Sequence, residues 1–417
     1  MKYIILIGDG MSDYPLKSLD NKTPLEIAYK PNIDKLTKEG KAGLVSNVPE
    51  GFSPGSDVAN MSIFGYDPKK YYTGRGPLEA GSMGIDLKDG DVAFRANLIT
   101  EEDGVLLDFN AGHISSEKAA ILIEDLNIYF KNNFNEDTLN KDLLSKDLLN
   151  KSKFNGKFYT GISYRHLFVI NNKELSGLNT APPHDIVGKK IDDYINWNDE
   201  NSKIIKDIME MSKDFLKNHP INKERVEKGK KPANMIWLWG QGLKPNLPNF
   251  EKLYGLKGSV ITGVDLLKGI GVFAGLDIIE VPGATGYFDT DYTAKGKYAS
   301  KAIKHNDIIF IHIEAPDEAG HSGEVKEKIK AIEKIDKHVL GQILDELENY
   351  NDYKIAILPD HPTPIDLRTH TMDPVPLAIY SSNNDTDEVK TYNELSVKKG
   401  SIDLSEGYKL IDYLISN

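Results

Sequence analysis

The sequence predicts an α/β protein built on a mostly parallel β-sheet that helices cover on both faces, with a smaller α+β domain inserted into it. Short, nearly continuous apolar runs recur in the first and last parts of the chain, and such runs are typical of buried parallel strands. Helical stretches alternate with these runs, as in a parallel sheet covered on both faces. The middle of the chain instead carries short alternating strands and hairpin signals. From this change of pattern, we expect the larger domain to comprise residues 1–87 and 233–417 and the insert to comprise residues 88–232.

The larger domain begins with an apolar strand that stops at Gly8-Asp9-Gly10. Pro24 near the start and Gly40 past the end mark its first helix. The elements expected before the insert are a strand over Lys2–Ile7, a helix over Thr23–Gly40, a strand over Ala42–Val48, and a short helix over Leu78–Met83.

The insert combines strands and helices without a regular alternation. Glu101-Glu102-Asp103-Gly104 separates its first two strands and is a hairpin signal. The charged, Asn- and Lys-rich stretch Lys131–Lys153 has little core content and is expected on the surface. The expected elements are strands over Val92–Ile99, Gly104–Asp108, Lys157–Thr160 and Arg165–Ile170, and helices over Ser115–Tyr129 and Lys203–Asn218.

The α/β pattern resumes after the insert. Helical stretches lie between the later strands, and a long helix is expected over Glu324–Leu347. The expected strands are Met235–Trp239, Ser259–Thr262, Asp277–Val281, Asp307–Glu314 and Lys354–Leu358.

The composition excludes several classes of function. The 417 residues carry a net charge of −12 at pH 7, which argues against nucleic acid or an anionic membrane as the main partner. With no cysteine, the chain has no disulfide, thiolate metal site or cysteine nucleophile. Neither a secretory signal nor an apolar run of membrane-spanning length is present, so a cytoplasmic location is expected.

The turn around Ser56 is a candidate anion-binding site. Pro54-Gly55 indicates a turn, and Ser56 takes the position of an N-cap before a short helix, Val58–Phe64. The hydroxyl of such a serine lies outside the helix, beside the free N–H groups of its first turn, where phosphate binds readily. An ordinary N-cap serine produces the same local pattern, so the rest of the chain has to decide between the two.

Three of the predicted strands run into a carboxylate: Asp9, Asp317 and Asp360. In open α/β sheets, ligands bind beyond the carboxyl ends of the strands. Three acidic groups at that edge would repel one another unless cations lie between them.

Imidazoles accompany these carboxylates: His321, His361 and His370. Three Asp and three His suit Mn²⁺, Zn²⁺ or Co²⁺. Six ligands are too many for one catalytic ion that keeps an open position, so two ions ~3.5–4 Å apart are expected, as is usual in phosphoryl chemistry. Each motif alone is a common turn or helix start, but their joint occurrence at strand ends favours a metal site. The remaining histidines considered are expected at the surface (His219, His305 and His338) or in the core (His312).

These motifs resemble the alkaline phosphatase superfamily and, more closely, the archaeal-type cofactor-independent phosphoglycerate mutases. The superfamily motifs are Gly8-Asp9-Gly10, Pro54-Gly55-Ser56-Asp57, Pro316-Asp317-Glu318-Ala319-Gly320-His321, Pro359-Asp360-His361-Pro362 and Thr369-His370-Thr371. Two longer strings are specific to this branch: Tyr71-Tyr72-Thr73-Gly74-Arg75-Gly76-Pro77-Leu78-Glu79 and Trp237-Leu238-Trp239-Gly240-Gln241-Gly242. The resemblance covers nearly the whole chain.

The resemblance implies an alkaline-phosphatase-like domain with two divalent ions and an insert that binds the substrate. Ser56 would be the nucleophile that becomes phosphoserine. One ion would be shared by Ser56, Asp9, Asp360 and His361, and the other held by Asp317, His321 and His370. Mn²⁺ is the expected ion, with Co²⁺, Zn²⁺ or Mg²⁺ as alternatives, and no 2,3-bisphosphoglycerate is needed. The candidates for binding the anionic substrate are Lys244, Lys268, His113, Arg165 and Arg75, with exposed surface charge as the alternative role.

The function implied is interconversion of 3-phosphoglycerate and 2-phosphoglycerate, in glycolysis and gluconeogenesis. Three alternatives remain open at this point. The chain also resembles proposed homoserine kinases of the same branch, which would phosphorylate homoserine with ATP. A metal-dependent phosphomonoesterase would release inorganic phosphate instead. A non-enzymatic metal-stabilised binding protein would have no use for a serine on an anion-binding turn.

Overall fold

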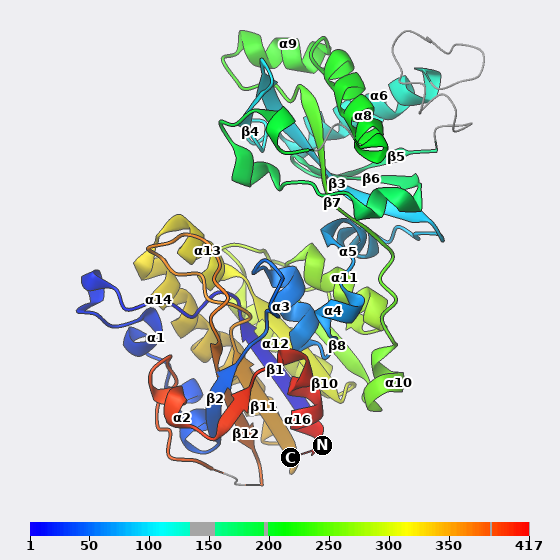
Figure 1. Ribbon diagram of the computed structural model, residues 1–417. Helices are drawn as coiled ribbons and strands as arrows, with labels where there is room; N and C mark the ends of the chain where they lie inside the picture. The colour runs from blue at the N-terminus through cyan, green and yellow to red at the C-terminus, as the bar shows by residue number, and fades with distance from the viewer. Residues whose placement is uncertain (134–154, 196–198, 384–385, 417) are drawn as a thin grey trace. The chain divides into compact units, whose positions relative to one another are not determined.

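The computed structural model describes residues 1–133, 155–195, 199–383 and 386–416, which form two compact units. Unit 1 comprises Met1–Tyr72 and Asn246–Asn417, and unit 2 comprises Thr73–Pro245 (Figure 1). Most of the stretch predicted to lie on the surface, from residue 134 to 153, is outside the described residues.

Unit 1 contains an eight-stranded sheet in the order β13-β2-β12-β11-β1-β10-β8-β9. β12 pairs antiparallel with β11 and β2, and the other pairs are parallel. The predicted fold class is confirmed. The strands are β1 (Lys2–Gly8), β2 (Lys41–Val45), β8 (Gly258–Ile261), β9 (Asp277–Ile278), β10 (Ile308–Ile313), β11 (Tyr353–Leu358), β12 (Val375–Ser381) and β13 (Ile402–Leu404).

The helices of unit 1 follow the predicted alternation, with one break. The helix predicted over Thr23–Gly40 is two helices, because Pro31 starts a new one and Lys30 before it has φ −133°. The long predicted helix is continuous but contains a π-helical segment, η5. The α-helices are α1 (Pro24–Ile27), α2 (Pro31–Lys38), α3 (Ser56–Ile63), α4 (Pro68–Tyr71), α10 (Phe250–Tyr254), α11 (Asp265–Ala274), α12 (Tyr292–Ile303), α13 (Ala315–Ser322), α14 (Val325–Lys334), α15 (Gly341–Leu347) and α16 (Leu410–Ser416). The shorter turns are η1 (Lys17–Leu19), η5 (Ile335–Leu340), η6 (Ser396–Lys399) and η7 (Gly407–Lys409).

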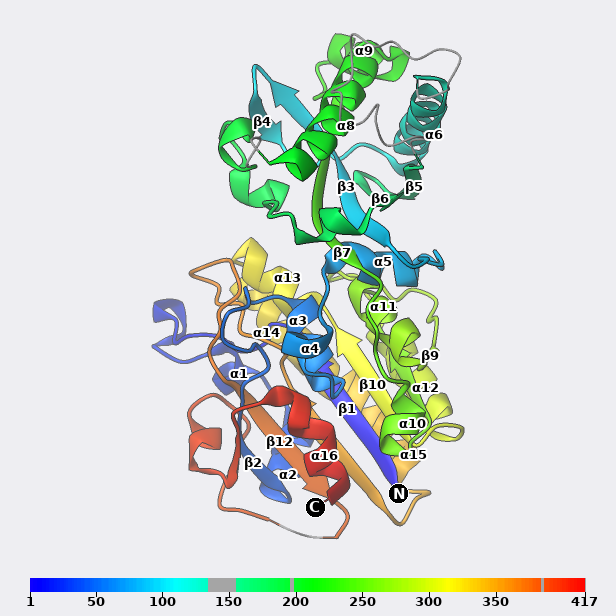
Figure 2. The ribbon, with the colours of Figure 1, turned by 45° about the vertical axis from the view of Figure 1, so that its right-hand side comes forward.

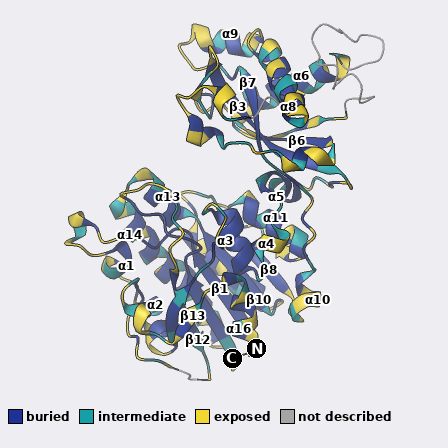
Figure 3. Cartoon of the chain, in the orientation of Figure 1, coloured by how far each residue is buried: buried dark blue, intermediate teal, exposed yellow. Residues whose placement is uncertain are grey.

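Helices lie on both faces of the sheet (Figures 1 and 2). On one face, Ile4 and Ile309 pack in a cluster with residues of α2, α12, α14 and α15. On the other face, the ring of Phe310 stacks on Phe64, directly after α3, with centroids 4.2 Å apart. Residues 309 and 310 point to opposite faces because side chains alternate along a strand. The central strands are therefore buried on both sides, which explains their continuous apolar runs (Figure 3).

Unit 2 contains a five-stranded antiparallel sheet in which β3 pairs with β4, β6 and β7. The strand at Met235, which the sequence placed in the larger domain, is β7 and pairs with β3 of this sheet. An apolar run alone does not specify the sheet that it joins. The elements are α5 (Arg75–Ser82), β3 (Asp91–Glu102), β4 (Val105–Asp108), α6 (Ser116–Asn133), β5 (Lys157–Ile162), β6 (Arg165–Asn171), η2 (Lys173–Gly177), η3 (Pro183–Ile186), η4 (Ile191–Asp193), α8 (Glu200–Leu216), α9 (Pro220–Glu227) and β7 (Met235–Leu243). Across the described residues of both units, none of the helices combines the length and the apolar character that crossing a bilayer requires.

A fully buried ion pair connects three segments of unit 1. Lys328 of α14 has no exposed surface, and its Nζ donates to Asp13 Oδ2 at 2.7 Å. The same ammonium group donates to the backbone oxygens of Ser12 at 3.2 Å and Thr363 at 2.8 Å. Since Ser12 follows β1 and Thr363 follows β11, Lys328 joins the segments after two neighbouring strands.

We expect Lys328→Met to destabilise the protein by about 3–5 kcal/mol, because it leaves Asp13 as a buried charge without its cation. Urea unfolding of the metal-free protein measures this change. Lys330→Met is the matched control: Lys330 pairs with Glu327 at the surface, and an exposed pair is worth ~0–1 kcal/mol. Equal stabilities of the two variants would contradict this role of Lys328.

Candidate metal centre and phosphoryl acceptor

The three predicted strand-end carboxylates lie at the ends of three adjacent strands. β1 is in the middle of the sheet and pairs in parallel with β10 and β11. Asp9 directly follows β1, Asp360 follows β11, and Asp317 is in the first turn of α13, just after β10. Parallel strands end at the same edge, so the topology itself brings the three carboxylates together.

Gly10 allows these segments to approach closely. It has φ +59°, and a Cβ built there would lie 2.8 Å from Asp317 Cα and 2.5 Å from Thr363 Oγ1. A side chain at this position would therefore push the strand ends apart and also strain the backbone.

One cluster consists of Asp317, His321 and His370. Asp317 Oδ2 is 3.3 Å from His321 Nε2, and Oδ1 is 3.4 Å from His370 Nε2. The two Nε2 atoms are 2.9 Å apart. Each imidazole is oriented through its other nitrogen, because His321 Nδ1 faces the Arg368 oxygen at 3.0 Å and His370 Nδ1 faces the Pro54 oxygen at 3.3 Å. Two imidazoles aimed at one carboxylate, each held by a backbone carbonyl, are typical of a metal site.

A second cluster contains Asp9, Asp360 and His361. His361 Nε2 is 3.6 Å from Asp9 Oδ1 and 3.6 Å from Asp360 Oδ2. Ser56 Oγ lies 3.2 Å from the same Nε2 atom. Asp360 also accepts hydrogen bonds from Asn60 Nδ2 at 2.7 Å and from the backbone N–H of Gly10 at 3.2 Å. All of these side chains are at most 6% exposed.

Ser56 is the first residue of α3, and Gly55 takes the N-cap position that the sequence assigned to Ser56. Asn60, one turn later, donates through Nδ2 to the Ser56 carbonyl at 2.8 Å as well as to Asp360. The helix start is thus tied to the second cluster. The N–H groups of the first turn lack partners within the helix. They lie at the N-terminal end of α3, where Ser56 is also located.

His312 is buried, as predicted, but it also belongs to the site. Its Nε2 is 3.0 Å from Asp9 Oδ2, and Asp9, His312 and Asp360 form a further group close enough to hold an ion. The position of His312 inside a strand predicts a core residue. Its place on the strand next to Asp9, near the same edge of the sheet, also indicates a site residue.

His219 is not at the surface as predicted, since it is 9% exposed and lies 3.0 Å from Asp125 Oδ2.

Asp9 lacks the positive charge that would stabilise its buried carboxylate. Neither oxygen of Asp9 has a hydrogen-bond partner among the described residues, although the side chain is fully buried. Burial and the charges of Asp360, Glu314 and Asp317 raise the pKa of Asp9 well above its usual range. An ionised carboxylate in this position needs a cation, and the donor set of carboxylates and imidazoles fits a divalent metal ion.

In the cluster of Asp317, His321 and His370, charge pairing has a larger combined effect on the pKa of Asp317 and of His321 than burial has. Burial alone would raise the pKa of Asp317, but hydrogen bonds from His321 and His370 lower it well below its usual range. Burial likewise opposes protonation of His321, yet Asp317 raises the pKa of His321 to about 9. Without a metal, a proton on His321 therefore takes the place of the cation.

The structure places four of the five predicted substrate residues in unit 2 and Lys268 in unit 1. Lys244 lies 3.5 Å from Asp86, and Lys268 lies 3.0 Å from Glu280. The guanidinium of Arg75 is over the Trp239 ring at 5.8 Å, and that of Arg165 is over the Tyr164 ring at 5.8 Å. His113 hydrogen-bonds with Asn110. Binding of substrate by these residues stays a prediction.

Sequence analysis missed Arg95. It is 9% exposed, its Nε lies 3.0 Å from Glu79 Oε1, and its guanidinium is 4.5 Å from the Trp239 ring centroid. Burial lowers the pKa of Arg95, and the positive charges of Arg75 and Arg165 lower it further. Arg75 and Arg165 thus lie within electrostatic reach of Arg95. The signal was an arginine inside the mostly apolar strand Val92–Ile99, whose other polar residue is Asn97.

Comparison with known proteins gives consistent matches along the whole chain. The family described as 2,3-bisphosphoglycerate-independent phosphoglycerate mutase matches residues 37–222. A protein of that name (mutase 2) from Methanothermobacter thermautotrophicus is 50% identical over 415 residues, covering 100% of this chain and 97% of its own. A second, from Methanosarcina mazei, is 50% identical over 419 residues and both chains are covered to 100%.

Solved structures show the same fold. A protein from Pyrococcus horikoshii has a TM-score of 0.81 at 30% identity, covering 100% of this chain and 96% of its own. A cofactor-independent phosphoglycerate mutase from Thermoplasma acidophilum has a TM-score of 0.65 at 28% identity, with 100% and 99% covered. Because full-length relatives share half of its residues, the chain belongs to the cofactor-independent phosphoglycerate mutases, a family of isomerases in the alkaline phosphatase superfamily.

Proposed function

We propose that this protein interconverts 3-phosphoglycerate and 2-phosphoglycerate through a phosphoserine at Ser56, without 2,3-bisphosphoglycerate. The observation that carries the proposal is the position of Ser56 Oγ, 3.2 Å from His361 Nε2 at the start of α3. This position supports the proposal, because the hydroxyl lies beside clusters that could hold metal ions and at a helix end that favours phosphate. The predicted cytoplasmic location stays a prediction.

Two divalent ions fit the residues present. Asp9, Asp360, His361 and Ser56 would hold one, and Asp317, His321 and His370 the other. Mn²⁺ is the ion we expect, with Co²⁺, Zn²⁺ or Mg²⁺ as alternatives. When bound, the ions would lower the pKa of the Ser56 hydroxyl and neutralise charge on the transferring phosphoryl group.

The chain's own groups account for the remaining steps. Ser56 Oγ attacks the phosphorus of 3-phosphoglycerate, the bond from phosphorus to O3 breaks, and O3 takes up the proton that Ser56 loses. The glycerate then turns, and its O2 attacks the phosphorus of the phosphoserine. The bond from O2 to phosphorus forms, the bond from Oγ to phosphorus breaks, and Ser56 takes up the proton that O2 loses. The N–H groups of the first turn of α3 stabilise the charge on the phosphoryl oxygens throughout.

Unit 2 offers the cations for an anionic substrate. We propose that Arg75, Arg95 and Arg165 contribute to substrate binding. Arg95 pairs with Glu79, and burial together with the positive charges of Arg75 and Arg165 lowers the pKa of Arg95, so these arginines concentrate positive charge in unit 2. Fixed guanidinium groups suit carboxylate and phosphate oxygens. Lys244, His113 and Lys268 remain further candidates.

We expect Ser56→Ala to lower turnover by roughly 10⁴-fold or more, because it removes the phosphoryl acceptor. The assay is an enolase-coupled measurement on metal-stripped protein with Mn²⁺ restored and 2,3-bisphosphoglycerate absent. Ser62→Ala is the matched control, since Ser62 is buried in the same helix and its Oγ has no hydrogen-bond partner among the described residues. Full activity in Ser56→Ala would contradict the proposal, and faster release of inorganic phosphate than of 2-phosphoglycerate would favour a phosphomonoesterase.

Metal affinity should depend on pH. His321 must be neutral to bind an ion, and Asp317 raises the pKa of His321 to about 9 in the metal-free protein. Below that pH the ion has to displace a proton, so the apparent affinity should rise about tenfold per pH unit between pH 6.5 and 8. Calorimetric titration with Mn²⁺ in buffers of different ionisation enthalpy measures both the affinity and the proton released. An affinity that stays constant over this range would contradict the role of His321 as a ligand.

Arg95→Gln should raise the KM for 3-phosphoglycerate about tenfold, because it removes a charge-assisted contact with the substrate. Steady-state kinetics measures this effect. Lys157→Gln is the control, because Lys157 is an exposed cation on the same sheet whose Nζ lies over the Tyr159 ring. A KM for Arg95→Gln that equals that of the control would exclude Arg95 from substrate binding.

A further inference from the structure

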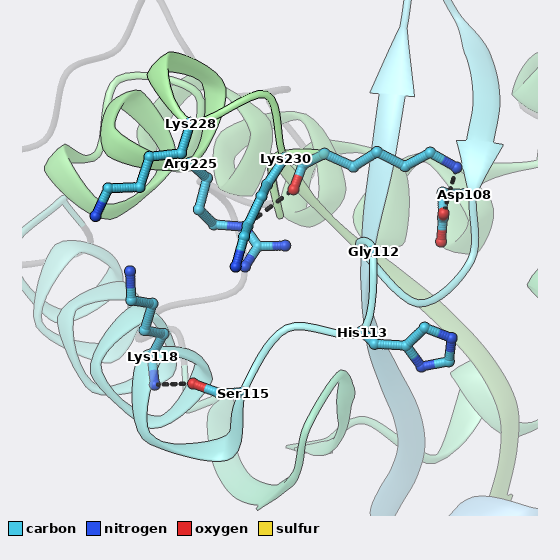
Figure 4. A pocket seen from close by; sticks show the side chains of 9 residues that line it. Asp108, Gly112, His113, Ser115, Lys118, Arg225, Lys228 and Lys230 are labelled. Atoms are coloured by element: carbon cyan, nitrogen blue, oxygen red, sulfur yellow. Dashed lines mark hydrogen bonds and ion pairs between the residues drawn. The ribbon is translucent and has the colours of Figure 1, made fainter.

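Unit 2 contains a cavity of about 520 Å³ whose wall is strongly cationic. The charged side chains that line it are Lys118, Arg225, Lys228, Lys230, Lys231 and Asp108 (Figure 4). The chain as a whole has a net charge of −12, so this concentration of positive charge is a local feature and not the general character of the protein.

Two carboxylates partly balance the five cations. Asp108 lies 2.5 Å from Lys231 Nζ. Glu224, which belongs to the same helix as Arg225, pairs with Lys118 at 3.1 Å and with Lys228. Hydrogen bonds from Lys228 and Lys118 lower the pKa of Glu224 to about 2. Burial opposes ionisation of Asp108, but hydrogen bonds from Lys231 and from backbone N–H groups lower the pKa of Asp108. Both carboxylates are thus ionised near neutral pH, and the wall still keeps a surplus of positive charge.

Arg225 is a fixed part of this wall. The residue is 5% exposed, its Nε donates to the Lys231 oxygen at 2.9 Å, and its Nη2 donates to the Ala111 oxygen at 2.5 Å. Within the described part of the chain, no acceptor is bonded to the remaining terminal nitrogen, Nη1. A nearly buried guanidinium that is held in place, with donors left over, is suited to an anion.

The loop that Arg225 holds is strained. Ala111, Gly112 and His113 are consecutive and have φ of 50°, 58° and 50°. This left-handed conformation is costly for Ala and His and tends to occur at ligand sites. A Cβ at Gly112 would lie 3.3 Å from Lys231 Cβ and 3.6 Å from Arg225 Nη2. The strained backbone therefore lies directly against the cations.

The loop leads into α6, whose first turn also borders the cavity. Ser115 precedes the helix, and its Oγ accepts from the backbone N–H of Lys118 at 3.5 Å. Figure 4 shows Lys118 rising from α6 on the opposite side of the cavity from Arg225 and Lys228. The dipole of this 18-residue helix adds partial positive charge at the same wall.

We propose that this cavity binds a small anion that carries two or more linked phosphate groups, such as a polyphosphate or the phosphate chain of a nucleoside triphosphate. Its volume lies within the range of about 300–1,000 Å³ that is usual for small-ligand sites. The surplus charge and the spread of cations over both sides exceed what a single phosphate would neutralise. The inference does not rest on the proposed function, because every lining residue belongs to unit 2 and the proposed nucleophile and metal ligands belong to unit 1.

Because of His113, the experiment must also distinguish this cavity from the substrate site. It lines the cavity and is also a predicted substrate residue, although Figure 4 shows its ring pointing away from Lys118 and Arg225. Competition with 3-phosphoglycerate, which carries one phosphate, therefore distinguishes a polyphosphate site from part of the substrate site.

The experiment is calorimetric titration of the full chain with sodium tripolyphosphate at low ionic strength. EDTA is present, so that divalent ions and turnover play no part. We expect binding to the wild type and a dissociation constant raised about tenfold or more in Lys228→Ser/Lys230→Ser, because two cations of the wall are removed. Lys217→Ser/Lys223→Ser is the matched control, with the same change of net charge at two exposed lysines outside this cavity. It should change the dissociation constant less than twofold, and the circular dichroism of both variants should equal that of the wild type.

Three results would overturn the proposal. The first is the absence of binding to the wild type, and the second is an equal loss of affinity in the two double variants. The third is displacement of tripolyphosphate by 3-phosphoglycerate at equal or lower concentration, which would make the cavity part of the substrate site. Tighter binding of ATP than of tripolyphosphate would support a nucleoside triphosphate, and the reverse would support a polyphosphate.

Discussion

Unit 1 is organised around carboxylates that are buried beside one another at the ends of three parallel strands. Asp9, Asp317 and Asp360 repel one another electrostatically, and Asp9 is fully buried without a hydrogen-bond partner among the described residues. Burying such groups is strongly unfavourable unless cations accompany them. In the metal-free chain, burial and the neighbouring carboxylates raise the pKa of Asp9, and Asp317 raises the pKa of His321. In both cases a proton supplies charge that a metal ion would otherwise supply.

The surrounding structure holds these groups in place. Gly10 lets the segments after β1 and β10 pack closely, and Lys328 joins the segments after β1 and β11 through Asp13 and Thr363. Thr363 Oγ1 in turn donates to Asp317 Oδ1 at 2.5 Å. Backbone carbonyls of Pro54 and Arg368 orient the two imidazoles of the first cluster. Main-chain geometry as well as side-chain packing thus fixes the directions of these side chains, as a preorganised metal site would require.

Much of the fold could be predicted because buried parallel strands leave a local signal. The runs at Lys2–Ile7 and Lys354–Leu358 are apolar on both faces, and both strands were located almost to the residue. Strand ends then implied that Asp9, Asp317 and Asp360 meet, which follows from topology alone. Pro31, which begins the second of the two helices, is also a local signal of a helix boundary.

Features that depend on tertiary contacts could not be predicted in the same way. Met235–Trp239 reads as a buried strand in either sheet, and only its pairing with β3 decides between them. β12 was missed because Pro376 lies inside it, and a proline weakens the strand signal. His312 and Arg95 are polar residues inside apolar strands, and their roles depend on Asp9 and Trp239, which are distant in sequence. A polar residue inside a predicted buried strand is therefore a candidate site residue.

We propose that the carboxylates and imidazoles at the strand ends hold two divalent ions. The number of metal ions bound per chain tests this directly. The protein is saturated with Mn²⁺, unbound Mn²⁺ is removed, and the bound metal is measured by inductively coupled plasma mass spectrometry. We expect two ions per chain in the wild type and one in Asp317→Asn, in which the cluster of Asp9, Asp360 and His361 is unchanged. One ion or none in the wild type would contradict it.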